Sequence, residues 1–137
     1  MPKHSVLLVR CALLWFLVGV GLGVAMLLSR ADLGWSGVWL LRPDHGWIML
    51  AGFMVQLALG VAHWILPRTR HVSPPGAARL WTALVLLNAG VLVLVAGPLM
   101  PIGPTPGLLL HAAGIALMVH SLWPRIQSIE VLRGEGS

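Results

Sequence analysis

The sequence predicts an all-α integral membrane protein, a bundle of four transmembrane helices. Of its 137 residues, 58% are hydrophobic and only 9% are charged, whereas an ordinary soluble domain carries roughly a quarter charged residues. Four apolar stretches are each close to the ~20 residues that cross a bilayer as a helix. Helices are expected because lipid cannot satisfy open backbone groups and four short spans cannot close a barrel. Residues 1–137 should form a single membrane domain, with spans at about 6–28, 45–66, 77–96 and 107–123.

The composition excludes several other classes of protein. A cytosolic globular enzyme of this size has no use for so much apolar surface. The single cysteine, Cys11, allows neither an intramolecular disulfide nor a cysteine-built metal cage. The net charge of +5 comes from basic residues scattered between apolar runs, which form no basic stripe for nucleic acid. The expected partner is therefore the lipid bilayer, and no nucleic acid.

The first span, at about 6–28, is expected to remain as a membrane helix. It is too long for a signal peptide, and the residues after it offer no small-x-small cleavage site. Gly19 and Gly23 form a small-xxx-small pair on this span, which lets helix backbones approach closely. We expect this glycine face to pack against another helix, either within the chain or across a homodimer.

The second span carries most of the polar side chains. At 100° per residue, His45, Gln56 and His63 lie within about 20° of one line along an ideal helix. A polar stripe that faces lipid costs free energy, so this stripe should face the bundle interior or a partner subunit. Interhelical hydrogen bonding accounts for Gln56 and for Asn88 in the third span. It accounts less well for two histidines placed one above the other.

The fourth span holds two more histidines. His111 lies in its outer half and His120 near its inner end, nine residues apart and therefore on opposite faces. The second and fourth spans both end in a histidine, three residues and then Pro-Arg. His63 and His120 should therefore lie at similar depth, while His45 and His111 both lie toward the outer side.

Basic residues set the expected orientation. The cytoplasmic ends of membrane helices carry an excess of Lys and Arg. Seven of the nine basic residues fall at one end of the expected bundle: Lys3, Arg10, Arg68, Arg70, Arg79, Arg125 and Arg133. The opposite end has only Arg30 and Arg42, partly offset by Asp32 and Asp44. We therefore expect both termini in the cytoplasm and the chain in the inner (cytoplasmic) membrane.

Six of the seven tryptophans agree with this orientation, since Trp is enriched at membrane interfaces. The outer group is Trp35, Trp39 and Trp47, and the inner group is Trp64, Trp81 and Trp123. Trp15 fits neither group well. His4 and His71 are expected to be solvated, in the cytoplasmic tail and loop.

The histidines of the second and fourth spans are candidate cofactor ligands. Neutral imidazole is an axial ligand of heme iron, and helical bundles bind cofactors between facing helices. One interpretation is a clamp for b-type heme, and the other is buried histidines without a cofactor. A c-type heme is excluded because no Cys-x-x-Cys-His occurs. Zinc and copper fit less well because these histidines are paired by depth rather than clustered, and no copper site is expected.

A resemblance carries the heme interpretation further. The segment Arg42-Pro43-Asp44-His45-Gly46-Trp47, continued by Gly60-Val61-Ala62-His63-Trp64-Ile65-Leu66-Pro67-Arg68, resembles the second membrane helix of the heme–copper oxidase catalytic subunit and of nitric oxide reductase. The whole chain is similar to small four-helix proteins called cytochrome c oxidase subunit I-like. Those proteins share the His-led second helix, an Asn in the third helix and a Trp-Pro-Arg ending of the fourth, here Asn88 and Trp123-Pro124-Arg125.

This resemblance implies that His45 is an axial ligand of heme b. It implies nothing about the rest of the oxidase site, because the large enzymes place their other ligands on helices that this chain lacks. Relatives often have Tyr or Asn where this chain has His63, so a role for His63 rests on this sequence alone. Reduction of O₂ or NO by this chain alone is therefore not expected.

The resulting hypothesis is a b-type heme protein, a homodimer that transfers electrons from a respiratory donor or binds a diatomic gas. His45 is the expected ligand, with His111 from the same chain or a two-fold mate as its partner. His63 with His120 is a candidate second heme site. The alternative is a cofactor-free packing subunit or assembly factor of a respiratory membrane complex, and a small transporter has less support.

Overall fold

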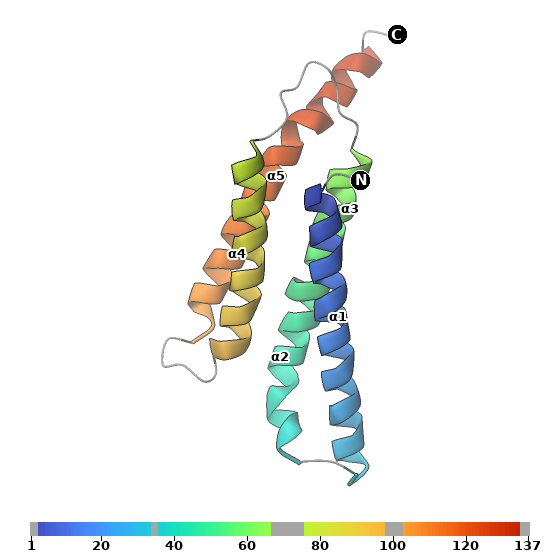
Figure 1. Cartoon of the computed structure of the whole chain (residues 1–137), viewed down its shortest axis with the longest axis vertical. Coiled ribbons are helices and arrows are strands. Elements are labelled where there is room, and N and C mark those ends of the chain that lie inside the picture. The colour runs from blue at the N-terminus through green and yellow to red at the C-terminus, as the bar shows by residue number, and fades with distance from the viewer. Residues whose placement is uncertain (1–2, 34–35, 67–75, 98–102, 135–137) are drawn as a thin grey trace.

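The computed structural model describes residues 3–33, 36–66, 76–97 and 103–134, with side chains up to residue 126. Its described residues form four long apolar helices, each long and apolar enough to cross a membrane (Figure 1), which confirms the all-helical prediction. The elements are α1 (Lys3–Arg30), η1 (Ser36–Leu41), α2 (Arg42–Trp47), the π-helix η2 (Ile48–Val55), α3 (Gln56–Ile65), α4 (Ala77–Ala96) and α5 (Thr105–Gly134). The run Ser36–Ile65 makes up the second candidate span.

Three of the four long helices extend beyond the apolar stretches that predict them, including α1, which covers Lys3–Arg30. The second begins before residue 45, because Pro43 occupies the first turn of α2, where a missing N–H costs no hydrogen bond. The last helix continues through Pro124 instead of ending at residue 123. A proline inside a helix leaves the carbonyl four residues earlier without its donor, here that of His120. By contrast, α4 covers the same residues as the expected third span.

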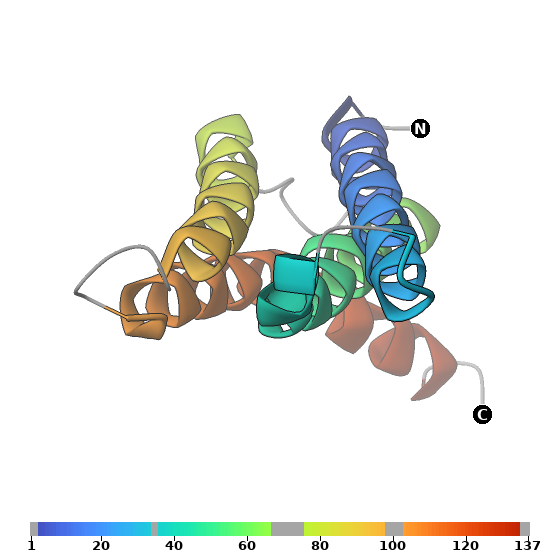
Figure 2. The ribbon, with the colours of Figure 1, turned by 90° about the horizontal axis from the view of Figure 1, so that it is seen from below.

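The helices form two antiparallel pairs. α1 packs along η2 and α3, and α4 packs along α5. Figure 1 shows the pairs side by side, with both chain ends at the same end of the bundle, and Figure 2 shows the second span lying between α5 and α1. Contact between the pairs is made mainly by α4 with η2, α2 and α1.

Glycines set the close approach of α4 and α5. A Cβ added at Gly90 would lie 2.7 Å from the backbone nitrogen of His111, and one at Gly107 would lie 2.6 Å from a backbone nitrogen of α4. A Cβ at Gly114 would lie 2.9 Å from the backbone nitrogen of Leu87. Since small residues let membrane helices approach closely, these three positions form a tight seam between the two helices.

The glycine face expected on the first span packs within the chain. A Cβ at Gly19 would meet side chains of η2, and one at Gly23 would lie 3.2 Å from Cε1 of His45. In return, Gly52 of η2 makes room for Trp15, whose Cγ would lie 2.8 Å from an added Cβ. The pair formed by α1 and the second span is therefore held by small residues on both sides.

Apolar side chains fill the space between the two pairs. One buried cluster joins α1, α4 and α5: Leu8, Leu80, Ala83, Leu87 and Met118. A second cluster joins η2 to α4: Ala51, Val91 and Leu94. These clusters fix how the second span and α4 face one another, which places the polar residues described below.

Candidate functional site

The π-helix η2 corrects the expected polar stripe. Under uniform α-helical winding, His45, Gln56 and His63 share one face, but eight residues between the first two wind as a π-helix. A π-helix turns less per residue than an α-helix, so the register slips across this segment. His45 consequently contacts α1, while Gln56 reaches α4. Gln56 and His63 lie within α3 alone and both stay buried.

His45 lies half-buried on α2 against the glycine face of α1. Its Nδ1 is 3.0 Å from the main-chain carbonyl oxygen of Gly19. A carbonyl can only accept a hydrogen bond, so Nδ1 carries the proton and Nε2 carries the lone pair. The absent side chain at Gly23 leaves room for the ring. The ring is thus held in the tautomer that ligates a metal through Nε2.

His111 repeats this arrangement on the other helix pair. Its side chain is 6% exposed, and its Nδ1 is 3.1 Å from the carbonyl oxygen of Leu87 on α4. Its Nε2 is buried, and no described residue gives it a hydrogen bond. A buried polar atom without a partner costs free energy, which makes this nitrogen a candidate ligand atom.

The structure does not bring His45 and His111 into contact with the same helix. His45 lies against α1, whereas His111 lies against α4 at Gly90 and Leu87. α5 packs along α4, which turns His111 toward that helix. The observed ring positions therefore do not by themselves define one cofactor site shared by both histidines.

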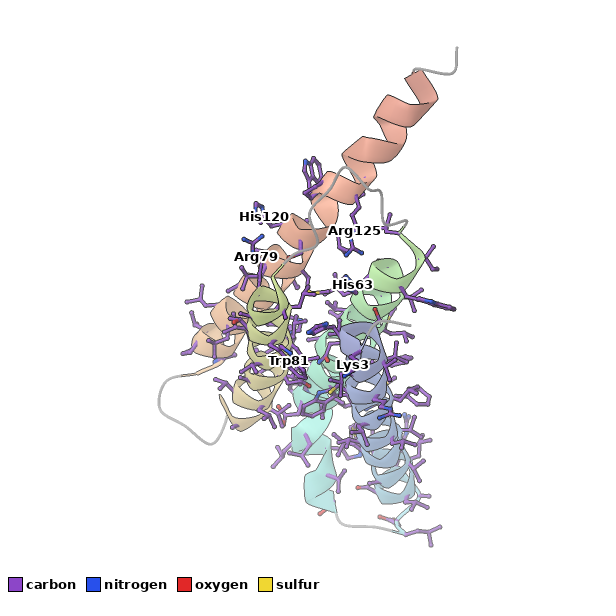
Figure 3. The ribbon with its side chains drawn as sticks, turned by 45° about the horizontal axis from the view of Figure 1, so that its top comes forward. Lys3, His63, Arg79, Trp81, His120 and Arg125 are labelled. Carbon is purple, nitrogen blue, oxygen red and sulfur yellow. The ribbon has the colours of Figure 1, made fainter. Side chains whose placement is uncertain are left out.

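At the other end of the bundle, His63 and His120 point in different directions. His63 is 2% exposed, and its carbonyl oxygen accepts a 3.4 Å hydrogen bond from Nη1 of buried Arg125. His120 is exposed. Figure 3 shows Arg125 on the side of α5 turned toward His63, and His120 on the opposite side. The structure thus pairs His63 with Arg125 and does not bring it together with His120.

Midway along the bundle, three polar side chains from three helices meet at Asn88. Its Oδ1 accepts hydrogen bonds from the indole N–H of Trp15, at 3.0 Å, and from Nε2 of Gln56, at 3.4 Å. Its Nδ2 donates to Oε1 of Gln56, at 3.3 Å, and to the Leu84 carbonyl, at 2.9 Å. The expected interhelical hydrogen bonding of Gln56 and Asn88 is confirmed. Trp15 belongs to neither interfacial group of tryptophans, because its indole N–H donates to Asn88 midway along the bundle.

His4 is not a solvated tail residue. It lies in the first turn of α1, half-buried, with its ring packed edge-on against Trp81 of α4 at a centroid distance of 5.1 Å. An amphipathic imidazole packs well on an indole face at a helix end, and the helix begins earlier than expected. His71, Arg68, Arg70 and Trp35 lie outside the described residues.

Sequence reasoning missed Asp44. The expected second span begins one residue after Asp44, but the structure places Asp44 within α2, where its side chain is only 4% exposed and it lines a cavity between α1 and α2. The signal was present in the sequence, since Pro43 favours a helix start and a long apolar run follows it. A carboxyl group one residue after such a start lies inside the helix rather than in a loop.

Among the described residues, no three His, Cys, Asp or Glu side chains gather to hold a metal ion. No protein-family model, curated protein or solved structure matches the chain. The chemistry of the site therefore rests on its own residues.

Proposed function

We propose that this chain is a b-type heme protein that transfers electrons within a membrane. One observation supports this proposal above the others. Both outer histidines, His45 and His111, have Nδ1 fixed by a main-chain carbonyl, and Nε2 of His111 is buried without a described partner. Metal-ligating histidines almost always donate their other ring N–H to a carbonyl or carboxylate, which fixes the tautomer.

In this proposal, His45 and His111 would hold the iron through Nε2, and heme b would supply one-electron chemistry when bound. The chain's contribution is orientation. Gly19 and Leu87 supply the carbonyls that hold the two rings, and Gly23 gives one ring its space. The two rings lie against different helices. The second axial ligand opposite each histidine would therefore come either from the other histidine of the same chain or from the second chain of a homodimer.

A dithionite-reduced minus oxidised spectrum of the purified protein tests the proposal. We expect sharp α and β bands and about one heme per chain or per dimer. His45→Ala and His111→Ala should each lower heme content at least about tenfold, because a ligand is lost. His4→Ala, which removes a histidine packed on Trp81, is the matched control and should keep its heme.

Two results would contradict the heme proposal. One is a wild-type protein that stays colourless after reconstitution with heme. The other is full heme content in both ligand variants at normal expression. Repeating the spectrum with CO separates a six-coordinate electron carrier, which does not bind CO, from an open gas-binding iron.

A second function, a packing subunit of a respiratory membrane complex, is favoured by the bare surface of α1. In the most apolar 18-residue stretch of α1, only 17% of the residues are buried, whereas 33% are buried in the corresponding stretch of each of the other three spans. Leu14, Leu17 and Leu27 are all more than 60% exposed on this helix. A partner subunit or a second copy would cover this face, and a colourless wild-type protein would make this function the leading one.

A further inference from the structure

One hollow among the described residues lies at the end of the bundle opposite the chain termini. It has a volume of about 770 Å³ and lies between α1 and the first turns of the second span, with Val95 of α4 on one side. This volume is within the range of about 300–1,000 Å³ typical of small-molecule sites. Its walls include Val18, Leu22, Leu40 and Ile48, all apolar. It contains none of the four candidate heme ligands.

Asp44 is the only ionisable side chain among the described residues that line this cavity. The Asp44 residue is only 4% exposed, and its Oδ1 is buried with no described hydrogen-bond partner. The nearby basic residues Arg30 and Arg42 are exposed, and neither lines the cavity. A buried carboxylate is retained where something pairs with it, and among the described residues no side chain or backbone group donates to this Oδ1.

We propose that this cavity binds a lipophilic ammonium, a molecule with an apolar body and one positively charged N–H donor. The apolar walls would take the body, and the ammonium would donate to the carboxylate of Asp44. A neutral apolar ligand would fill the space and leave the carboxylate unpaired, and an anion would be repelled by it. Charge and shape thus both favour a cationic amphiphile.

Two fluorescent probes with the same apolar body test this proposal in phosphatidylcholine nanodiscs. We expect wild-type protein to bind 1-pyrenemethylammonium about 10- to 100-fold more tightly than neutral 1-pyrenemethanol, as for a hydrogen bond to a charged group. Asp44→Asn should abolish this preference. Asp32→Asn removes an exposed carboxylate at the same end of the bundle, and it should preserve the preference. Empty nanodiscs give the background partitioning of each probe.

A second variant tests the cavity without changing its charge. A Cβ added at Gly21 meets nothing within 4 Å, and this residue lines the cavity. Gly21→Leu should therefore fold normally, fill the space and weaken binding of both probes. Equal binding of the two probes by wild-type protein, a preference that survives Asp44→Asn, or unchanged binding in Gly21→Leu would each overturn the proposal.

The same assay distinguishes the two sources of such a ligand. Phosphatidylethanolamine carries an ammonium head on an apolar body, as a free lipophilic amine does. If replacing phosphatidylcholine by phosphatidylethanolamine displaces the probe from wild-type protein, the resident ligand is a lipid amine. If the probe stays bound, the ligand is a free lipophilic amine.

Discussion

The carboxamide of Asn88 joins the two helix pairs at a single polar point. It is hydrogen-bonded to Trp15 on α1 and to Gln56 on α3. Each of these partners would be costly to leave unpaired, because Gln56 is fully buried and lipid offers no donor or acceptor. The loss of one amide group therefore affects three helices.

Asn88→Leu should lower the free energy of unfolding by about 1 to 2 kcal/mol, since it leaves the Trp15 and Gln56 groups without their partner. Unfolding the protein in mixed micelles by adding sodium dodecyl sulfate measures this change in free energy. In the matched double variant Asn88→Leu/Gln56→Leu, the total cost should be smaller than the sum of the two single costs. The difference should be about 0.6 to 1.7 kcal/mol. Additive costs would show that the two amides do not interact.

At this scale the sequence predicts which side chains need partners better than it predicts the partners. The cost of a polar group in lipid identifies Gln56 and Asn88 as an interhelical pair, as observed. The carbonyls that hold His45 and His111 were not predictable, because they depend on how closely two helices approach. That distance depends on glycines, which hydropathy treats as neutral.

At the scale of the helices, hydropathy predicts number and approximate position because the length of a span is set by the bilayer. It does not predict winding. The π-helix Ile48–Val55 contains no sequence signal that distinguishes it from an α-helix, yet it turns His45 away from the face of Gln56. Angular arguments along a long helix therefore hold only within uninterrupted α-helical segments such as α3.

The seam between α4 and α5 gives a prediction for the helices. Gly114→Ala should destabilise the protein by about 1 to 3 kcal/mol, because the new Cβ would lie 2.9 Å from the backbone of Leu87. Gly21→Ala is the matched control, since its Cβ enters open space. That variant should be neutral or stabilise by up to about 1 kcal/mol through its helix propensity. The same unfolding titration measures both, and equal effects would contradict the seam.

At the scale of the whole molecule, the charge distribution and the fold agree on one topology. Both chain ends lie at one end of the bundle (Figure 1). The described basic residues Lys3, Arg10, Arg79 and Arg125 belong to the same end by their positions along the helices. The structure places both termini and these basic residues at one end of the bundle. That this end faces the cytoplasm is a prediction from the excess of positive charge.

Cysteine labelling measures that direction. In a Cys11→Ala background, which removes the only native cysteine, Leu33→Cys should react with a membrane-impermeant maleimide in intact cells. Leu33 is 76% exposed at the end opposite the termini. Lys3→Cys, also exposed, should react only after the membrane is permeabilised. Labelling of Lys3→Cys in intact cells would overturn the proposed orientation.

The position of Asn88 in the chain also has a consequence for biogenesis. Synthesis completes α1 and the second span before Asn88, so a first hairpin inserted into a bilayer at that stage would hold the Gln56 carboxamide and the Trp15 N–H without their later partner. Neither group finds a substitute in acyl chains. The arriving α4 would then relieve a cost already present in the nascent protein, and this relief would favour the observed pairing of hairpins once the third span is inserted.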